Sequence, residues 1–124
     1  MFQQPDDPEI MEGNVLLEKI SHEFREIAAE VKASEKRFSL LLPKNSQQWE
    51  RNGGIALRLV SIRRLGNARI QELHGHPTKG ADVKSALKPA VNEFSAVLRD
   101  EKLDKSDFFA RTADHIKILQ ELVK

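Results

Sequence analysis

Residues 17–41 read LEKISHEFREIAAEVKASEKRFSLL and set the architecture of the chain. Within this stretch apolar side chains recur at alternating steps of three and four residues, an average period of about 3.5. The positions on this seam are Leu17, Ile20, Phe24, Ile27, Val31, Phe38 and Leu41, with Ser34 as the one polar member. Such a period is typical of a long helix with one narrow apolar seam. Because a helix of this kind cannot bury its seam alone, the rest of the chain must supply packing partners.

The residues on either side of this stretch predict where the first helix begins and ends. Ile10 and Gly13 continue the seam toward the N-terminus, and Pro8 suits the first helical turn, where its missing N–H is not needed. Residues 1–9 are acidic, proline-containing and poor in apolar side chains, which predicts a flexible acidic lead. Pro43 is expected to stop the helix just before it.

Three further amphipathic segments follow. The expected helices span residues 54–74, 81–101 and 107–123. Residues 46–52 are expected to form a separate turn, because Gly53 and Gly54 together disfavour a helix interior by roughly 1–2 kcal/mol. Short links make consecutive helices antiparallel neighbours. The sequence therefore predicts an all-α protein, an antiparallel four-helix bundle in up-down-up-down order with a long N-terminal helix, and one domain over residues 10–124.

The composition narrows the classes of function. The chain has 124 residues and a formal net charge of +1, which argues against a strongly electrostatic partner such as bulk duplex DNA. It has no cysteine, so disulfides and thiolate chemistry are excluded and a cytoplasmic location is expected. No apolar run is long enough for a membrane helix. No Gly-rich phosphate loop or nucleophile elbow is present, so an enzyme and a bound cofactor are not expected.

Some apolar residues fall outside the core-facing seams of the second and fourth helices. The predicted interaction surface consists of Leu57, Ser61, Leu65, Ala68, Phe109 and Ile118. Each large side chain of this kind contributes roughly 1.5–3 kcal/mol when it is buried. The sequence therefore predicts a non-enzymatic helical interaction and assembly module that binds a protein partner, most readily a second copy of itself.

A histidine pattern gives the first alternative function. The run His76-Pro77-Thr78-Lys79-Gly80-Ala81 carries the H-x-x-K-G-[S/A] pattern of histidine phosphotransfer domains, and the stretch resembles the phosphorylation site of that family. The resemblance implies that His76 carries a phosphoryl group on an exposed helical face. It also implies that Lys79, one turn further on, balances the charge, and that Gly80 leaves room for a receiver domain.

Basic residues give the second alternative function. Four arginines make the second helix basic: Arg58, Arg63, Arg64 and Arg69. At 100° per residue Arg58 and Arg69 share one flank, whereas Arg63 and Arg64 point elsewhere. A nucleic-acid-associated role is therefore an alternative that the spacing does not favour.

The remaining polar residues predict contacts that stabilise the fold, and they do not predict a metal or catalytic site. His74 and His76 are two residues apart, but no second histidine pair supports a metal site, and none is expected. Counting residues from the helix ends places Ser34, Thr112 and His115 at similar heights. The sequence therefore predicts one polar layer in the core that fixes the register of the first and fourth helices.

Overall fold

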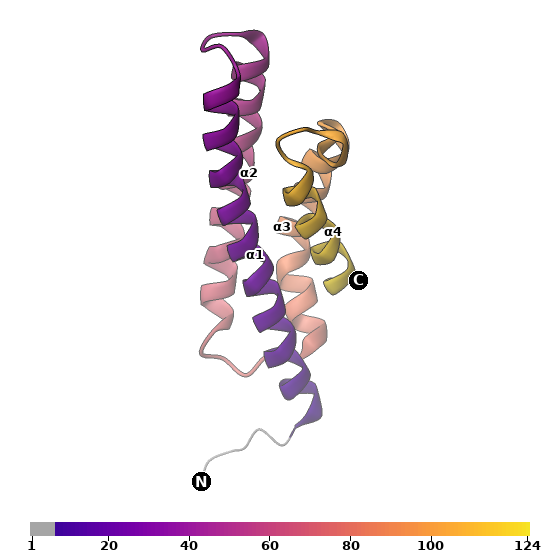
Figure 1. The fold of residues 1–124 in the computed structure, drawn as a ribbon. Helices are drawn as coiled ribbons and strands as arrows, with labels where there is room; N and C mark the ends of the chain where they lie inside the picture. Colours follow the sequence, from indigo (N-terminus) through magenta and orange to yellow (C-terminus); the bar gives the residue numbers. More distant parts are fainter. Residues whose placement is uncertain (1–6) are drawn as a thin grey trace.

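The computed structural model describes residues 7–124 and confirms the all-α, four-helix architecture (Figure 1). Its elements are α1 (Pro8–Leu41), α2 (Gln47–Leu73), α3 (Gly80–Asp100), the short 3-10 helix η1 (Leu103–Lys105) and α4 (Ala110–Leu122). No helix in this described part of the chain is both long enough and apolar enough to span a membrane.

Helix α1 is organised by the predicted seam. The buried seam residues are Leu17, Ile20, Phe24, Ile27, Val31, Ser34 and Phe38. Its N-terminus is capped by Asp7, whose side chain accepts a hydrogen bond from the Glu9 N–H at 2.9 Å. The prediction for Leu41 is wrong, because its side chain is exposed. The tip of the α1–α2 hairpin rises above the α3–α4 end, so α1 has no third helix beside it at that level (Figure 1).

The predicted flexible lead over residues 1–9 is corrected at its end. Helix α1 starts at Pro8, so Pro8 and Glu9 belong to the bundle. Proline fits here because the first helical N–H groups have no partner within the helix. The part of the prediction that covers residues 1–6 lies outside the described residues.

Helix α2 is continuous, which corrects the expected break at Gly53 and Gly54. The Ser46 side chain accepts a hydrogen bond from the Trp49 N–H at 3.1 Å and starts the helix before both glycines. Burial of Asn52 and Ile55 on either side of the glycine pair holds this stretch against the bundle. Packing therefore outweighs the weak helix propensity of two glycines.

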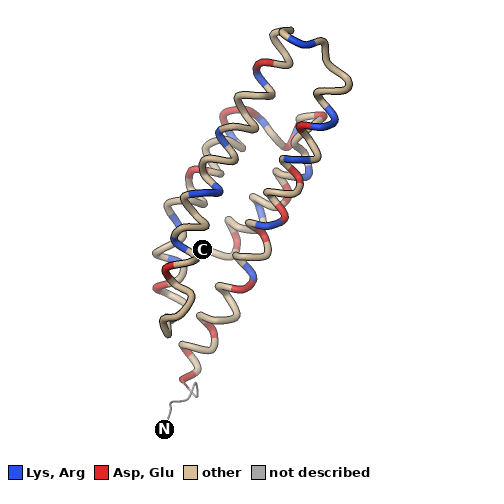
Figure 2. Tube along the Cα trace, turned by 90° about the vertical axis from the view of Figure 1, so that its left-hand side faces the viewer, with Lys and Arg blue, Asp and Glu red and all other residues tan. Residues whose placement is uncertain are grey.

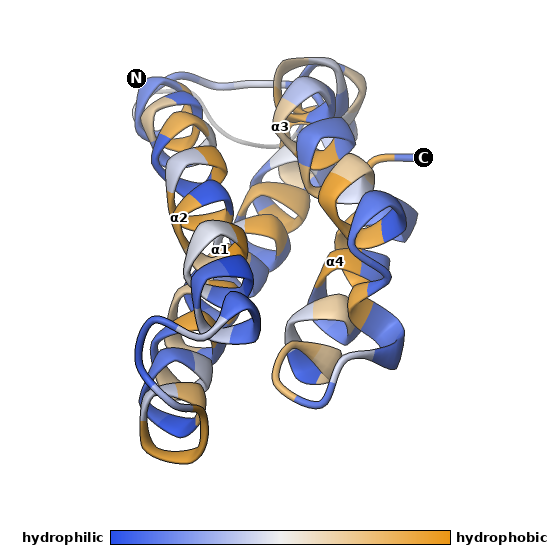
Figure 3. Ribbon diagram, turned by 90° about the horizontal axis from the view of Figure 1, so that it is seen from above, coloured by the Kyte–Doolittle hydropathy of each residue, from blue (hydrophilic) through white to orange (hydrophobic). Residues whose placement is uncertain are grey.

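The helices are arranged so that α1 and α3 form the centre. Within residues 7–124, α2 and α4 each contact both α1 and α3, but they do not contact each other. Figure 3, a view from above, places α2 and α4 on opposite sides of the bundle. The outward faces of α2 and α4 therefore belong to different sides of the molecule.

Helix α4 is short and begins later than the sequence predicts. The Ser106 side chain accepts hydrogen bonds from the N–H groups of Phe108 and Phe109, both at 3.1 Å, so this segment forms turns and the helix starts at Ala110. With 13 residues against 34 in α1, α4 is about 20 Å long and α1 about 51 Å. The first turns of α1 consequently have no α4 beside them (Figure 1).

Candidate functional site

The exposed apolar stripe expected on the second helix is present on the outer side of α2. Leu57 and Leu65 are 69% and 67% exposed, and Ser61 and Ala68 are exposed on the same side of the helix. Ser61 donates a hydrogen bond to the Leu57 carbonyl at 3.1 Å, so its hydroxyl is satisfied within the helix. These four residues, Leu57, Ser61, Leu65 and Ala68, are called the α2 face below.

The expected contribution of the fourth helix to the same surface is corrected. Phe109 is fully buried, and its ring centroid lies 6.2 Å from that of Phe38. It faces the core because the turns before α4 direct the chain inward. Ile118 is exposed, but α4 lies on the opposite side of the bundle from α2. The six predicted residues therefore do not form one surface.

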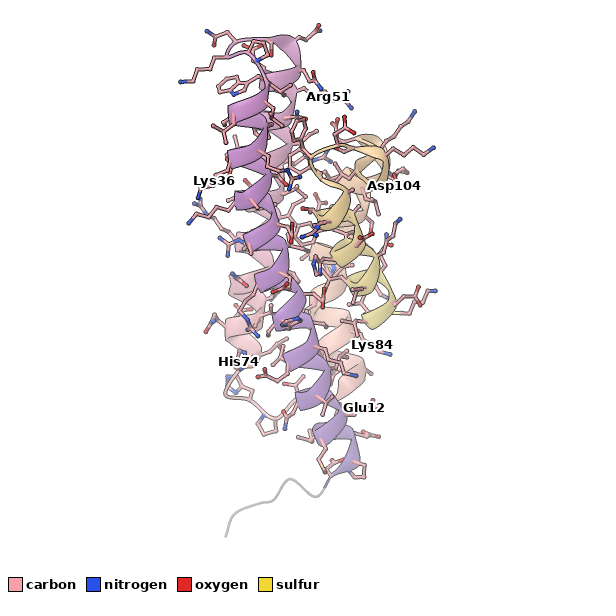
Figure 4. The ribbon with its side chains drawn as sticks, viewed as in Figure 1. Glu12, Lys36, Arg51, His74, Lys84 and Asp104 are labelled. Atoms are coloured by element: carbon pink, nitrogen blue, oxygen red, sulfur yellow. The ribbon has the colours of Figure 1, made fainter. Side chains whose placement is uncertain are left out.

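A second apolar surface lies where α4 ends. Its floor and walls come from α1 and the last turn of α4: Pro8, Met11, Val15, Leu16 and Leu122. Charged residues form its rim: Glu12, Lys19, Lys84 and Glu121. Glu12 of α1 and Lys84 of α3 lie below the C-terminal end of α4 (Figure 4). This hollow, of about 580 Å³, is called the α4-end groove below.

The α4-end groove is the feature that sequence reasoning missed. Met11 and Val15 are 53% and 55% exposed, and neither lies on the core-facing seam of α1. The sequence did contain an indication of the groove, because the fourth expected helix is much shorter than the first. A length difference does not by itself say which side of the long helix is left open, and that depends on the packing of α4 against α1.

The arginines of α2 do not form a continuous basic surface. Arg58 pairs with Asp100 at 3.8 Å and Arg69 with Glu72 at 3.0 Å. Arg63 lines a hollow between α1 and α2, whereas Arg64 is exposed elsewhere on the helix. Acidic and basic residues are interspersed along the helices (Figure 2). The geometry adds no support to the nucleic-acid alternative.

Residues 76–79 of the histidine pattern lie in the α2–α3 loop, and only Gly80 and Ala81 belong to α3, which corrects the helical placement of His76 that the resemblance implies. His76 is exposed, and its backbone N–H donates to the Leu73 carbonyl oxygen at 3.3 Å. Lys79 precedes α3, and its Nζ lies 3.2 Å from a carboxylate oxygen of Glu9. The hydrogen bond from Lys79 to Glu9, followed by the negative charge of Glu9, raises the pKa of Lys79 above the ordinary 10.5. Gly80 is buried at the start of α3.

The predicted polar layer is split into separate contacts. The Ser34 hydroxyl donates to the Phe108 carbonyl, whereas His115 Nδ1 lies 2.6 Å from a carboxylate oxygen of Glu23. Ser34 and Glu23 are eleven residues apart on α1, which is about 16 Å along the helix. The Thr112 hydroxyl is buried without a hydrogen-bond partner in the described residues. These contacts fix the antiparallel register of α1 and α4.

Residues 7–124 contain no cluster of three or more histidine, cysteine, aspartate or glutamate side chains that could hold a metal ion. Comparisons of the chain with protein-family models, with curated proteins and with solved structures find no match. The candidate functional sites are therefore identified from geometry alone. They are the two apolar surfaces, the α2 face and the α4-end groove.

Proposed function

We propose that this chain is a non-enzymatic helical interaction and assembly module that self-associates. The observation that supports the proposal is the α4-end groove, which is a helix position of the bundle that α4 does not fill. An apolar groove between helices is the usual receptor for an amphipathic helix. We further propose that the module is located in the cytoplasm.

Apolar side chains along the groove would lose contact with water when a second helix binds. Met11 and Val15 are each more than half exposed, and Leu16 and Leu122 are partly buried beside them. Completing the burial of a side chain of this size contributes up to roughly 1.5–3 kcal/mol. Single exposed apolar residues are ordinary on protein surfaces. Several of them lining one groove are typical of a binding site.

The α2 face supports a second docking site, and its flanking charges suggest the occupant. A two-fold axis through Ser61 would pair Leu57 with Leu65 of a second copy. The same axis would bring Arg58 of both copies to one flank of the contact and Arg64 of both copies to the other, which is a repulsive arrangement of like charges. The α2 face therefore suits a helix of a different protein whose leucines are flanked by glutamate or aspartate.

The self-association is tested on the purified chain by light scattering and sedimentation over a concentration series. We expect a dimer whose fraction increases with concentration, because burial of the groove is a bimolecular event. Binding of a hydrophobic dye to the monomer should decrease as the dimer forms. A chain that remains monomeric at every concentration and binds no dye would contradict the proposal.

Two alternatives drawn from the sequence stay predictions. Phosphotransfer at His76 would give an acid-labile phosphate after incubation with phosphoramidate, and the His76→Gln variant would not be labelled. Nucleic-acid binding through the arginines of α2 would give filter binding that weakens steeply with salt. Neither readout is expected from an interaction module alone.

A further inference from the structure

The end of α4 sets how far the α4-end groove extends along α1. Helix α4 runs antiparallel to α1, as the contacts Ser34–Phe108 and Glu23–His115 establish. It ends at Leu122, which lines a hollow together with Lys19. The open groove therefore lies alongside residues 8–19 of α1, and a helix that reaches further along α1 must lie beside α4, over this hollow.

The groove side of α1 carries a charge pattern that is complementary to itself. Glu12 and Lys19 lie seven residues apart, two helical turns, on the side of α1 that lines the groove. Val15 and Leu16 lie between them. When two such helices pair antiparallel about a two-fold axis between Val15 and Leu16, Glu12 of each copy lies opposite Lys19 of the other. The two ion pairs would flank the apolar contact, as charged residues do beside coiled-coil seams.

We propose that the first turns of α1 from a second copy of this chain occupy the α4-end groove, in a symmetric dimer with antiparallel α1 helices. This inference rests on the proposed self-association and names the occupant and the contacts. In a two-fold dimer the same patch serves both copies, so each α1 fills the groove of the other. The two remaining rim charges, Lys84 and Glu121, are of opposite sign, so the rim does not repel an identical copy.

A neighbouring hollow extends this surface in the direction that the proposed dimer requires. It has a volume of about 330 Å³, lies between α1 and α4, and is lined by His22, Glu23, Ile118 and Leu122 among others. With the axis between Val15 and Leu16, Pro8 of the second copy reaches the level of Glu23. The exposed Ile118 is thereby brought into the interface, in contact with the start of the second copy's α1.

The proposed pairing of Glu12 with Lys19 can be tested by reversing the charge of each residue alone and of both together. Glu12→Lys alone places two lysines opposite each other, and Lys19→Glu alone places two glutamates opposite each other. We expect each single variant to dimerise about tenfold or more weakly, because each dimer contains two like-charge contacts. A mixture of the two single variants should form a heterodimer, and the Glu12→Lys, Lys19→Glu double variant should dimerise again. Lys36→Glu, exposed on α1 outside the groove, is the matched control.

A further variant keeps the test valid if a charge reversal disturbs the fold. The Glu12 carboxylate lies over Gly80, since a Cβ atom at Gly80 would come within 2.5 Å of it. Glu12→Lys therefore places a positive charge at the start of α3, where the helix dipole disfavours it. Val15→Lys avoids this contact and places a charge in the centre of the proposed interface. We expect it to be monomeric with an unchanged melting temperature.

The outcomes separate this inference from the proposed function. If the unmodified chain is monomeric, the self-association fails and the inference fails with it. If the chain dimerises but the single reversals and Val15→Lys leave the dimer unchanged, another face is used and only this inference is overturned. Loss of the dimer in both single variants without recovery in the mixture or in the double variant would also overturn the antiparallel pairing.

Discussion

The α2 face and the α4-end groove are both apolar and exposed, but they differ in how they are built. The α2 face is a stripe on the convex side of one helix, with Leu57 and Leu65 exposed by about two thirds. The groove has walls from α1 and the end of α4, and Lys84 of α3 lies on its rim. A partner on a convex stripe is contacted from one side, whereas a helix in a groove is contacted from several. The groove is therefore expected to bind more strongly per apolar side chain.

The exposure of one side chain thus does not measure its capacity to bind. Val15 is less exposed than Leu57, yet its position in a groove gives it more neighbours to contact when a second helix arrives. The surrounding charges differ as well. Glu12 and Lys19 complement an identical copy, whereas Arg58 and Arg64 repel one. The two surfaces are consequently expected to select different partners.

The largest effect is expected from Gly13→Ala, which pushes the start of α1, one wall of the groove, away from the α2–α3 loop and leaves the α2 face unchanged. A Cβ atom at Gly13 would lie 1.8 Å from the Thr78 carbonyl oxygen, a backbone atom of the loop that the start of α1 packs against. We expect a loss of about 1–3 kcal/mol in the free energy of unfolding, or more, because of this overpacking. Chemical denaturation measures the stability, and sedimentation should report loss of the dimer.

Gly54→Ala is the matched control for that substitution. A Cβ atom at Gly54 meets nothing within 4 Å, so only helix propensity changes. We expect this variant to gain up to about 1 kcal/mol of stability and to dimerise normally. Equal stability of the Gly13→Ala variant and the unmodified chain would contradict the close packing of α1 on the loop.

The second largest effect is expected in chemical cross-linking, which distinguishes the α4-end groove from the α2 face as the dimer interface. The sequence has no cysteine, so Val15→Cys and Leu57→Cys each place a single thiol on each chain. The proposed axis passes beside residue 15, so a mild oxidant should convert most of the Val15→Cys dimer into a disulfide-linked species on a non-reducing gel. Leu57→Cys should stay largely unlinked. Preferential linking at position 57 would move the interface to the α2 face.

A smaller effect on the fold is expected from charges on the α2 face. The Leu57→Glu, Leu65→Glu double variant should change the stability by no more than about 0.5 kcal/mol per site, because both side chains are exposed. The dimer fraction should remain that of the unmodified chain. Binding of a designed helical peptide with leucines flanked by glutamates should be lost, whereas a scrambled peptide should bind neither protein. Loss of the dimer would show that the two surfaces are not independent.

The smallest effect concerns the ion pair that ties the start of α1 to α3. Because the pKa of Lys79 is raised in the folded chain, the pair stabilises the fold below the ordinary value of 10.5, and this contribution is lost as the pH rises through the higher folded-state pKa. Lys79→Met should therefore melt slightly earlier than the unmodified chain near neutral pH. The difference should vanish at pH values well above 10.5. A difference that does not depend on pH would exclude the ion pair as its cause.

Most of the fold could be predicted because helix seams are local patterns. The spacing from Leu17 to Phe38 identifies one buried side of α1 without reference to any other helix, and the exposed stripe from Leu57 to Ala68 is visible in the same way. The wrong predictions are those in which a rule about neighbouring residues conflicts with tertiary packing. Gly53 and Gly54 have low helix propensity but lie inside a continuous α2, and Phe109 is directed into the core by the turns before α4.

The number and amphipathic character of the helices follow from the amino-acid order alone, since a period of about 3.5 residues is a property of neighbouring positions. The folded arrangement was needed to establish that α4 stops beside Lys19, that α2 and α4 lie on opposite sides, and that Met11 and Val15 line an open groove. These features depend on distances between segments far apart in the chain. Such distances are set by the packing of side chains from several helices at once.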